Sequence, residues 1–174
     1  MNKPAGDFLK RNSGMIKCVV LLLLTLPSLA IAQGFSPPED ISFRKDKLMS
    51  EGVRLGAEVF SLKAHAGKKL PTIVMCHGWG GTARALRSDA VVFARAGYLV
   101  VTFDYRGWGA SDGRIIRIGE KSKDGSDPEV KEIREVVDPI EQTTDLLNAI
   151  HWVQEEKQCD RERIGLWGSS FSGG

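Results

Sequence analysis

The sequence predicts an α/β fold with a mostly parallel, doubly wound sheet, and three observations point to this class. Continuous apolar runs rich in β-branched residues occur at 72–76, 98–103 and 164–167, as expected of strands buried on both faces of a sheet. Two segments with helical periodicity lie between these runs, and a glycine- or serine-rich turn follows each run. Strands that alternate with helices form parallel sheets with right-handed crossovers.

The first expected elements are two alternating stretches, 41–48 and 53–62, separated by the polar segment Ser50-Glu51-Gly52. Alternation interrupted by a short polar turn predicts an antiparallel hairpin. Between the first two buried runs, Thr82 can cap a helix that Gly97 ends.

The second expected helix has a sharper beginning. Asp138 is a good N-cap, Pro139 suits the first helical position, and Glu141 completes a capping box with Asp138, so a helix is expected to about Lys157. Its expected buried face consists of Ile140, Thr144, Leu147, Ile150 and Val153. The charged stretch 114–135 before it is expected to be a surface insertion.

The composition is that of one globular domain. Of 174 residues, 42% are hydrophobic and 26% are charged. Basic and acidic residues number 24 and 22, and the excess of basic residues lies within the first 33 positions. A near-neutral body without a basic stripe argues against nucleic acid and against an anionic membrane surface as the main partner.

The N-terminal 32 residues have the organisation of a secretory signal peptide. Lysines precede the apolar run 18–26, which is shorter than the roughly 20 residues of a membrane-spanning helix. Ala30-Ile31-Ala32 then supplies small residues for a cleavage site. We therefore expect a signal peptide at 1–32, a linker at 33–40, a globular body at 41–174, and export to the periplasm or the medium with no stable membrane anchor after cleavage. An uncleaved anchor is the alternative.

Two cysteines, Cys76 and Cys159, belong to the expected mature chain. Cys76 ends one predicted strand and Cys159 precedes the start of another, so a parallel sheet places them at opposite edges. A disulfide requires Cα atoms within about 7 Å, and two free thiols are expected. Three scattered histidines and these cysteines form no metal-ligand cluster, so neither a metal nor another cofactor is expected.

Three polar turns follow the three buried runs: 77–81 (HGWGG), 104–111 (DYRGWGAS) and 168–174 (GSSFSGG). In a parallel sheet such turns emerge at the same carboxyl edge, where folds of this class place their sites. The sequence therefore predicts one functional site built from these turns.

The last turn places a serine between small residues, as a sharp nucleophile turn requires. Ser170 has Gly168 two positions before it and Ser172 two positions after it, where bulky side chains would clash with neighbouring backbone. Ser172 replaces the second glycine of the usual G-x-S-x-G pattern, and Gly173 relaxes this departure. Ser172 also satisfies a small-x-Ser-x-small spacing, but Ser170 has the required offset from the strand and is the preferred nucleophile.

Together the three turns resemble those of the α/β-hydrolase superfamily. HGWGG is similar to its oxyanion loop, DYRGWGAS to its Asp-x-Arg-Gly turn, and GSSFSGG to its nucleophile elbow. The likeness is greatest to dienelactone-hydrolase-like and Xaa-Pro-dipeptidyl-peptidase-like members, where RIGLWGSS- and EVVDPIEQ-type stretches recur, and it covers 41–174. It implies a serine hydrolase that cleaves a small-molecule ester or a peptide, and leaves the choice between these substrates open.

The resemblance also implies residue roles. Ser170 would attack a carbonyl group, and the backbone N–H groups of Trp79 and Phe171 would stabilise the resulting oxyanion. Gly78 and Gly80 would let the loop backbone approach the substrate closely.

The chain order of the superfamily is serine, acid, histidine, whereas this sequence ends four residues after Ser170. His77 precedes the serine and is expected to orient the oxyanion loop instead of serving as general base. Asp104 and Arg106 are expected to fix their own turn. The resemblance thus implies the N-terminal part of a hydrolase domain, truncated after the strand of the nucleophile elbow and without the triad acid and histidine.

Two other classes stay open at this point. Residues 78–83 match G-x-G-x-x-A between a strand and a helix, and Asp104 ends the next strand, which is the outline of a dinucleotide-binding fingerprint. The preceding His77, the expected export and the serine-centred third turn count against it. The other class is a non-catalytic or degenerate hydrolase-fold protein that binds a ligand or partner.

Overall fold

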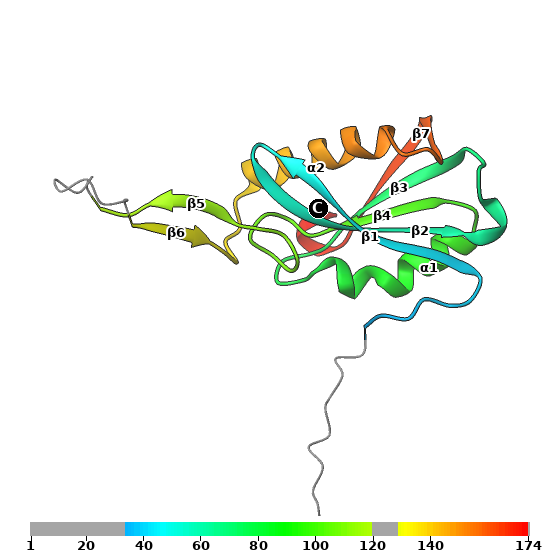
Figure 1. The fold of residues 1–174 in the computed structure, drawn as a ribbon, viewed down its shortest axis with the longest axis horizontal. Helices are drawn as coiled ribbons and strands as arrows, with labels where there is room; N and C mark the ends of the chain where they lie inside the picture. Colours follow the sequence, from blue (N-terminus) through cyan, green and yellow to red (C-terminus); the bar gives the residue numbers. More distant parts are fainter. Residues whose placement is uncertain (1–33, 120–128, 174) are drawn as a thin grey trace, which may run out of the picture. The chain divides into compact units, whose positions relative to one another are not determined.

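The computed structural model describes residues 34–119 and 129–173, so the expected signal peptide lies outside the described residues. Its main sheet has five strands in the order β1-β2-β4-β3-β7. The strands are β1 (Ile41–Ser50), β2 (Val53–Leu62), β3 (Leu70–Cys76), β4 (Leu99–Phe103) and β7 (Cys159–Gly168). Helices α1 (Arg87–Arg95) and α2 (Pro139–Gln154) cover opposite faces of this sheet (Figure 1). The predicted α/β class is confirmed.

The predicted hairpin is β1 and β2, paired antiparallel from Ile41 opposite Leu62 to Ser50 opposite Val53. Glu51 and Gly52 form the turn with φ of 46° and 82°. Positive φ at both positions gives a tight turn whose twist matches that of the strands. A short 3-10 turn, η1 (Lys63–His65), then leads into β3.

Strands β4, β3 and β7 form the parallel half of the sheet, in which β4 pairs with β3 and β3 pairs with β7. Each of these strands is followed by one of the three polar turns. All five residues of β4 are buried, as its apolar run predicts. β7 is longer than the predicted 164–167, because Cys159 already pairs with Leu70. A register shift then accommodates the charged residues 160–163 before Ile164 pairs with Thr72.

The segment before α1 differs from the prediction. A 3-10 turn, η2 (Ala83–Leu86), precedes the helix, and the Thr82 side chain makes no capping hydrogen bond. The carboxylate of Asp104 instead accepts the N–H of Ala83 at 2.6 Å. A residue from the next strand end therefore replaces the expected local cap.

Helix α2 begins with Asp138 as N-cap, as predicted, because the Asp138 carboxylate accepts the N–H groups of Ile140 and Glu141, each at 3.0 Å. Among the described residues the Glu141 side chain does not complete the expected capping box and contacts Arg106 and Arg114 instead. The expected buried face is wrong at Ile140 and Leu147, which are exposed. The buried residues of α2 are Gln142, Asp145, Ala149 and Val153. The helix turns this partly polar face inward because Asp145 pairs with a buried arginine described below.

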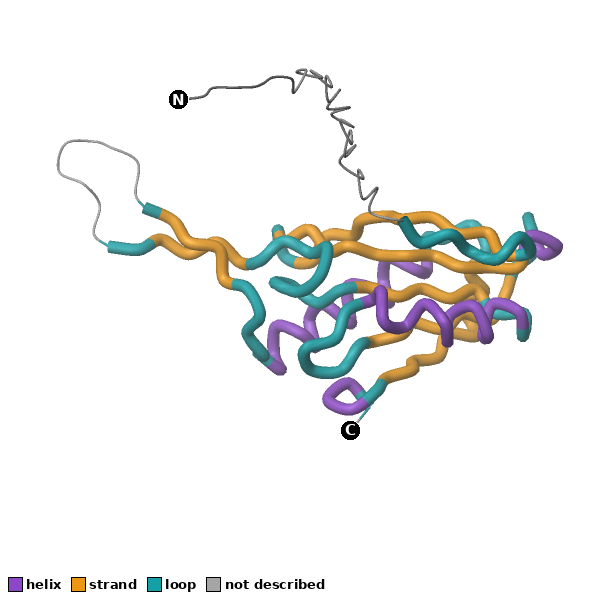
Figure 2. Tube along the Cα trace, turned by 90° about the horizontal axis from the view of Figure 1, so that it is seen from below, coloured by secondary structure: helices purple, strands orange, loops and turns teal. Residues whose placement is uncertain are grey.

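The charged insertion is at the surface, as expected, but it contains a hairpin that the sequence pattern did not predict. Strands β5 (Arg114–Arg117) and β6 (Val130–Ile133) pair antiparallel and project away from the main sheet (Figure 1, Figure 2). The Glu132 carboxylate accepts the N–H of Gly113 at 2.6 Å and thereby holds the base of the hairpin.

Both described cysteines, Cys76 and Cys159, are buried free thiols, which confirms the prediction. They lie at opposite ends of neighbouring strands, since Cys76 pairs with Gly168 and Cys159 with Leu70. Across residues 34–119 and 129–173, no helix is long and apolar enough to cross a membrane. The same residues contain no cluster of His, Cys, Asp and Glu that could hold a metal ion.

Candidate active site

The turns that follow β3, β4 and β7 meet at one end of the sheet, as predicted. The Ser172 hydroxyl lies 3.0 Å from the Tyr105 hydroxyl and 2.7 Å from the carbonyl oxygen of His77. A Cβ placed on Gly78 would lie 3.0 Å from the Cβ of Ser170. One hydrogen-bonded cluster therefore contains residues from all three turns.

Ser170 begins the short 3-10 turn η3 (Ser170–Ser172), is exposed, and has a φ of +55°. This is the left-handed region, which a residue with a Cβ seldom adopts. A Cβ on Gly168 would overlap the carbonyl oxygen of Ser172, and one on Gly173 would lie 2.7 Å from the carbonyl oxygen of Gly168. The turn is therefore as tight and as strained as a nucleophile elbow requires.

The two candidate nucleophiles differ in their hydrogen bonds. Both bonds of the Ser172 hydroxyl anchor it to other turns, whereas no hydrogen bond among the described residues uses the hydroxyl of Ser170. This difference favours Ser170. Sequence reasoning missed Tyr105 as a partner, although its place two residues after the end of β4 puts it at the same sheet edge.

The turn after β3, which contains the expected oxyanion loop, lies against the turn after β7. Gly80 has a φ of +71°, and the N–H of Gly81 donates to the carbonyl oxygen of Gly78 at 3.0 Å. Trp79 stands between them with 75% of its surface exposed. A side chain at Gly78 would push against the backbone and side chain of the elbow, so a glycine there permits the close approach.

His77 holds this turn as a neutral imidazole. The N–H of Tyr105 can only donate, and it points to Nε2 of His77 at 3.3 Å, so Nδ1 bears the ring proton. Nδ1 then donates to the carbonyl oxygen of Gly78 at 2.9 Å. Both ring nitrogens are occupied, in agreement with an orienting role and not with a general base.

The peptide that links Gly78 to Trp79 is thereby fixed. Its carbonyl oxygen accepts from His77 and from Gly81, and because a peptide is planar, this also fixes the direction of the Trp79 N–H. Within the described part of the chain, no hydrogen bond uses the N–H of Trp79 or of Phe171. Phe171 directly follows Ser170 in the chain, and Trp79 directly follows Gly78, which lies against Ser170.

Residues 51–174 match the X-Pro dipeptidyl-peptidase (S15) family. The chain belongs to this family. An uncharacterized 31.7 kDa protein from the traX-finO intergenic region of Escherichia coli is 35% identical over 130 residues, which are 74% of this chain and 37% of that protein. The chain thus spans just over a third of the length of this relative.

Two solved structures share the fold. A hypothetical protein from Pseudomonas aeruginosa superimposes with a TM-score of 0.61 at 24% identity, covering 76% of this chain and 36% of that chain. The α/β hydrolase GrgF from Penicillium sp. sh18 gives a TM-score of 0.56 at 25% identity, covering 76% and 38%. The expected membership of the α/β-hydrolase superfamily is confirmed.

In this S15-family chain, Asp104 organises the turn after β4. Its carboxylate accepts the N–H groups of Ala83 at 2.6 Å and Ala110 at 2.8 Å, and its side chain is buried. Both carboxylate oxygens of Asp104 thus help to hold this turn, as expected. The membership of the S15 family counts against the dinucleotide-binding alternative.

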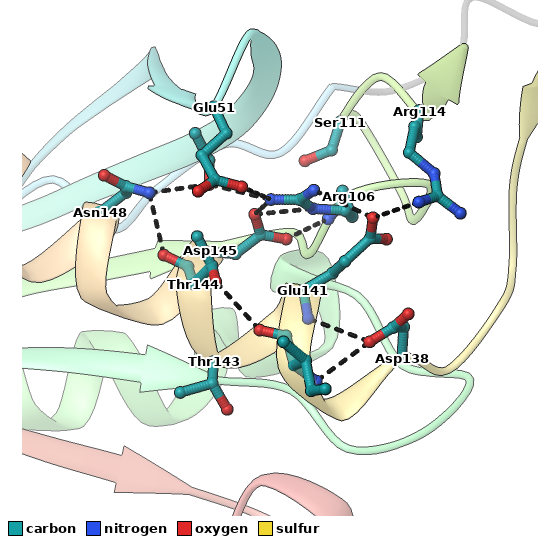
Figure 3. A network of polar contacts seen from close by, with 12 residues as sticks. Glu51, Arg106, Ser111, Arg114, Asp138, Glu141, Thr143, Thr144, Asp145 and Asn148 are labelled. Atoms are coloured by element: carbon teal, nitrogen blue, oxygen red, sulfur yellow. Dashed lines mark hydrogen bonds and ion pairs between the residues drawn. The ribbon is translucent and has the colours of Figure 1, made fainter. Parts of the chain in front are cut away.

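Arg106 joins the same turn to α2 (Figure 3). Its Nε and Nη2 donate to the carboxylate of Asp145 at 3.0 and 2.7 Å, and its backbone N–H donates to the same carboxylate at 2.9 Å. Glu141 adds a weaker contact at 3.5 Å and also pairs with Arg114 at 2.9 Å. Sequence reasoning missed Asp145, because its partner Arg106 lies 39 residues away and no local pattern indicates the pair.

Two ionisable side chains next to these turns, Cys76 and Tyr105, are buried. Burial raises the pKa of the Cys76 thiol to about 11, and burial likewise raises the pKa of the Tyr105 phenol above its usual range. Both groups are therefore uncharged at neutral pH. Hydrogen bonds in such surroundings are stronger than in water.

Two cavities lie near these turns. The larger, of about 520 Å³, is bounded by β1 and β2, by the segment that leads into α1 and by the turn after β4, and Ser170 does not line it. The other, of about 300 Å³, is bounded by Tyr105, Phe171 and Ser172 on one side and by α2 on the other. The second cavity adjoins the elbow.

Proposed function

We propose that this chain contains the nucleophile and the oxyanion hole of a serine hydrolase, with Ser170 forming an acyl-enzyme. One observation supports this most strongly. Ser170 has a positive φ and lies against Gly78, whose successor Trp79 has an unpaired N–H. Ser170 is also followed directly by Phe171, whose N–H is unpaired as well. Two preorganised donors beside a nucleophile are what acyl transfer requires.

In the proposed reaction, the Ser170 oxygen bonds to the carbonyl carbon while a base removes the hydroxyl proton. The negative charge moves to the carbonyl oxygen, where the N–H groups of Trp79 and Phe171 bind it. Collapse of this intermediate expels the alcohol or amine, which takes the proton from the base. A water molecule, deprotonated by the same base, then bonds through its oxygen to the acyl carbon. The bond between this carbon and the Ser170 oxygen breaks, and the base returns the proton to Ser170 as the acid leaves.

We assign the base and its carboxylate partner to residues after the elbow in the complete reading frame. His77 is occupied at both ring nitrogens, and no His or carboxylate among the described residues bonds to Ser170. The superfamily order of serine, acid and histidine supports this assignment, as does the 37% coverage of the Escherichia coli relative. The substrate class is a small-molecule ester or a peptide.

Fluorophosphonate labelling of the protein made from the complete reading frame tests the proposal. We expect covalent label on Ser170, loss of all label in Ser170→Ala, and full labelling of Ser88→Ala, which removes an exposed serine from α1. Peptide mapping locates the label. An unlabelled protein would instead support the non-catalytic class.

We also propose that the protein is exported, on the basis of the apolar run 18–26 and the Ala30-Ile31-Ala32 site. Intact-mass measurement of the protein from the extracytoplasmic fraction should give a chain that begins at Gln33. A chain that retains residues 1–32 in the membrane fraction would support the uncleaved anchor.

A further inference from the structure

The serine that replaces the second glycine of the G-x-S-x-G pattern makes hydrogen bonds to two other turns of the site. Ser172 occupies the second-glycine position, and its hydroxyl lies between the turns after β3 and β4. A glycine at this position could make neither contact. The hydroxyl therefore does something that the usual motif does not.

The directions of the two hydrogen bonds follow from the chemistry of the groups. The carbonyl oxygen of His77 can only accept, so the single proton of Ser172 goes to it across 2.7 Å. The Tyr105 phenol must then donate to the Ser172 oxygen across 3.0 Å. Tyr105 keeps its proton at all working pH values because it is buried.

This chain of bonds connects the two halves of the proposed oxyanion hole. Ser172 directly follows Phe171, one donor residue, and its hydroxyl holds the carbonyl of His77, two residues before Trp79, the other donor residue. Tyr105 holds the His77 ring through its backbone N–H and Ser172 through its phenol. The separation of the two donors therefore depends on Ser172 and Tyr105.

We infer that Ser172 and Tyr105 are positioning residues that set the separation and direction of the oxyanion donors. The inference rests on the proposed acyl-enzyme chemistry. Neither side chain supplies a group to the reacting atoms, and both act through the backbone of Phe171 and Trp79. Loss of a whole oxyanion donor costs about 10²- to 10³-fold in kcat, so displacement of a retained donor should cost roughly tenfold.

The first test uses the protein from the complete reading frame and an activated ester. Ser172→Gly, which restores the usual motif, should lower kcat roughly tenfold while KM changes less than about twofold, because ground-state binding does not use the oxyanion donors. Ser172→Thr keeps the hydroxyl and should retain more activity than Ser172→Gly. Thr144→Ala, which removes a hydroxyl bonded only within α2, is the matched control.

The inference also predicts that the effects of substituting Tyr105 and Ser172 on kcat are not additive. As a single substitution, Tyr105→Phe should lower kcat. In the Ser172→Gly background it should lower kcat little further, because the phenol acts through the serine. Independent losses that multiply, or a Ser172→Gly enzyme with unchanged kcat and normal labelling of Ser170, would overturn the inference and leave the acyl-enzyme intact.

A second measurement does not depend on catalysis. Amide hydrogen exchange in 77–81 should be faster in Ser172→Gly and Tyr105→Phe than in the parent protein, because the loop loses an anchor. Unchanged exchange would overturn the inference even if the enzyme is inactive. Absence of label on Ser170 combined with faster exchange would reject the proposed function while the structural link stands.

Discussion

At the scale of single residues, the backbone of Ser170 stores strain. Its φ of +55° costs a non-glycine residue about 1 to 2 kcal/mol, and glycine avoids this cost. The free energy of unfolding of Ser170→Gly should therefore be about 1 kcal/mol higher than that of Ser170→Ala, because glycine adopts this φ without strain. Both variants lack the hydroxyl, so its loss does not contribute to the difference. Urea unfolding followed by circular dichroism measures the difference. The same pair at Ser88 in α1 should give the opposite order, because glycine weakens a helix; equal values at Ser170 would contradict a strained turn.

Burial also determines the reactivity of the thiols. With a pKa of about 11, the Cys76 thiol is ionised in only about one molecule in a thousand at pH 8. In the chain from Gln33 onward, a disulfide reagent such as dithiobis-nitrobenzoate should therefore modify no thiol in the native state and two in urea. Rapid modification of Cys76 in the native state, located by peptide mapping, would show that the site is open to solvent at this thiol.

The sequence predicts the site only as far as local chemistry extends. The small neighbours of Ser170 and the glycines around Trp79 can be recognised in the sequence, because the steric constraints that require them involve residues only a few positions apart. The contact of Tyr105 with Ser172 joins positions 67 residues apart, and no periodicity indicates it.

At the scale of elements, the buried pair of Arg106 and Asp145 joins the turn after β4 to α2. Asp145 is fully buried and Arg106 is 7% exposed. Asp145→Ala should destabilise the protein by about 3 to 5 kcal/mol, because it leaves a buried arginine without its partner. Glu141→Ala removes the more distant contact with Arg106 and the partly exposed ion pair with Arg114, and should cost less than about 1 kcal/mol. Urea unfolding of both variants tests this; similar losses would mean that the burial of the pair contributes nothing.

The same pair explains why the buried face of α2 was predicted wrongly. Apolar periodicity favoured Ile140 and Leu147, yet the helix buries Asp145 because its carboxylate accepts three bonds from Arg106. A similar tertiary contact replaced the Thr82 cap with Asp104. Strand and helix positions were predictable from local patterns, whereas orientation and capping depended on residues distant in sequence.

At the scale of the whole molecule, the described sheet has two edge strands with different protection. β1 presents the charged run Arg44-Lys45-Asp46-Lys47, and charges on an edge strand discourage pairing with another chain. β7 is charged only in its first half, 160–163. Its second half, Ile164–Gly168, is apolar and pairs with β3 on one side only within the described residues.

This asymmetry predicts how the 174-residue chain behaves at high concentration. Self-association should occur through the second half of β7, where Leu166 is 57% exposed. Leu166→Lys should lower the weight-average sedimentation coefficient at high protein concentration, because it places a charge where two edges would meet. Met49→Lys changes a residue that is 60% exposed on the protected strand β1 and should leave association unchanged. Equal effects of the two substitutions would show that association responds to net charge and does not involve the edge of β7.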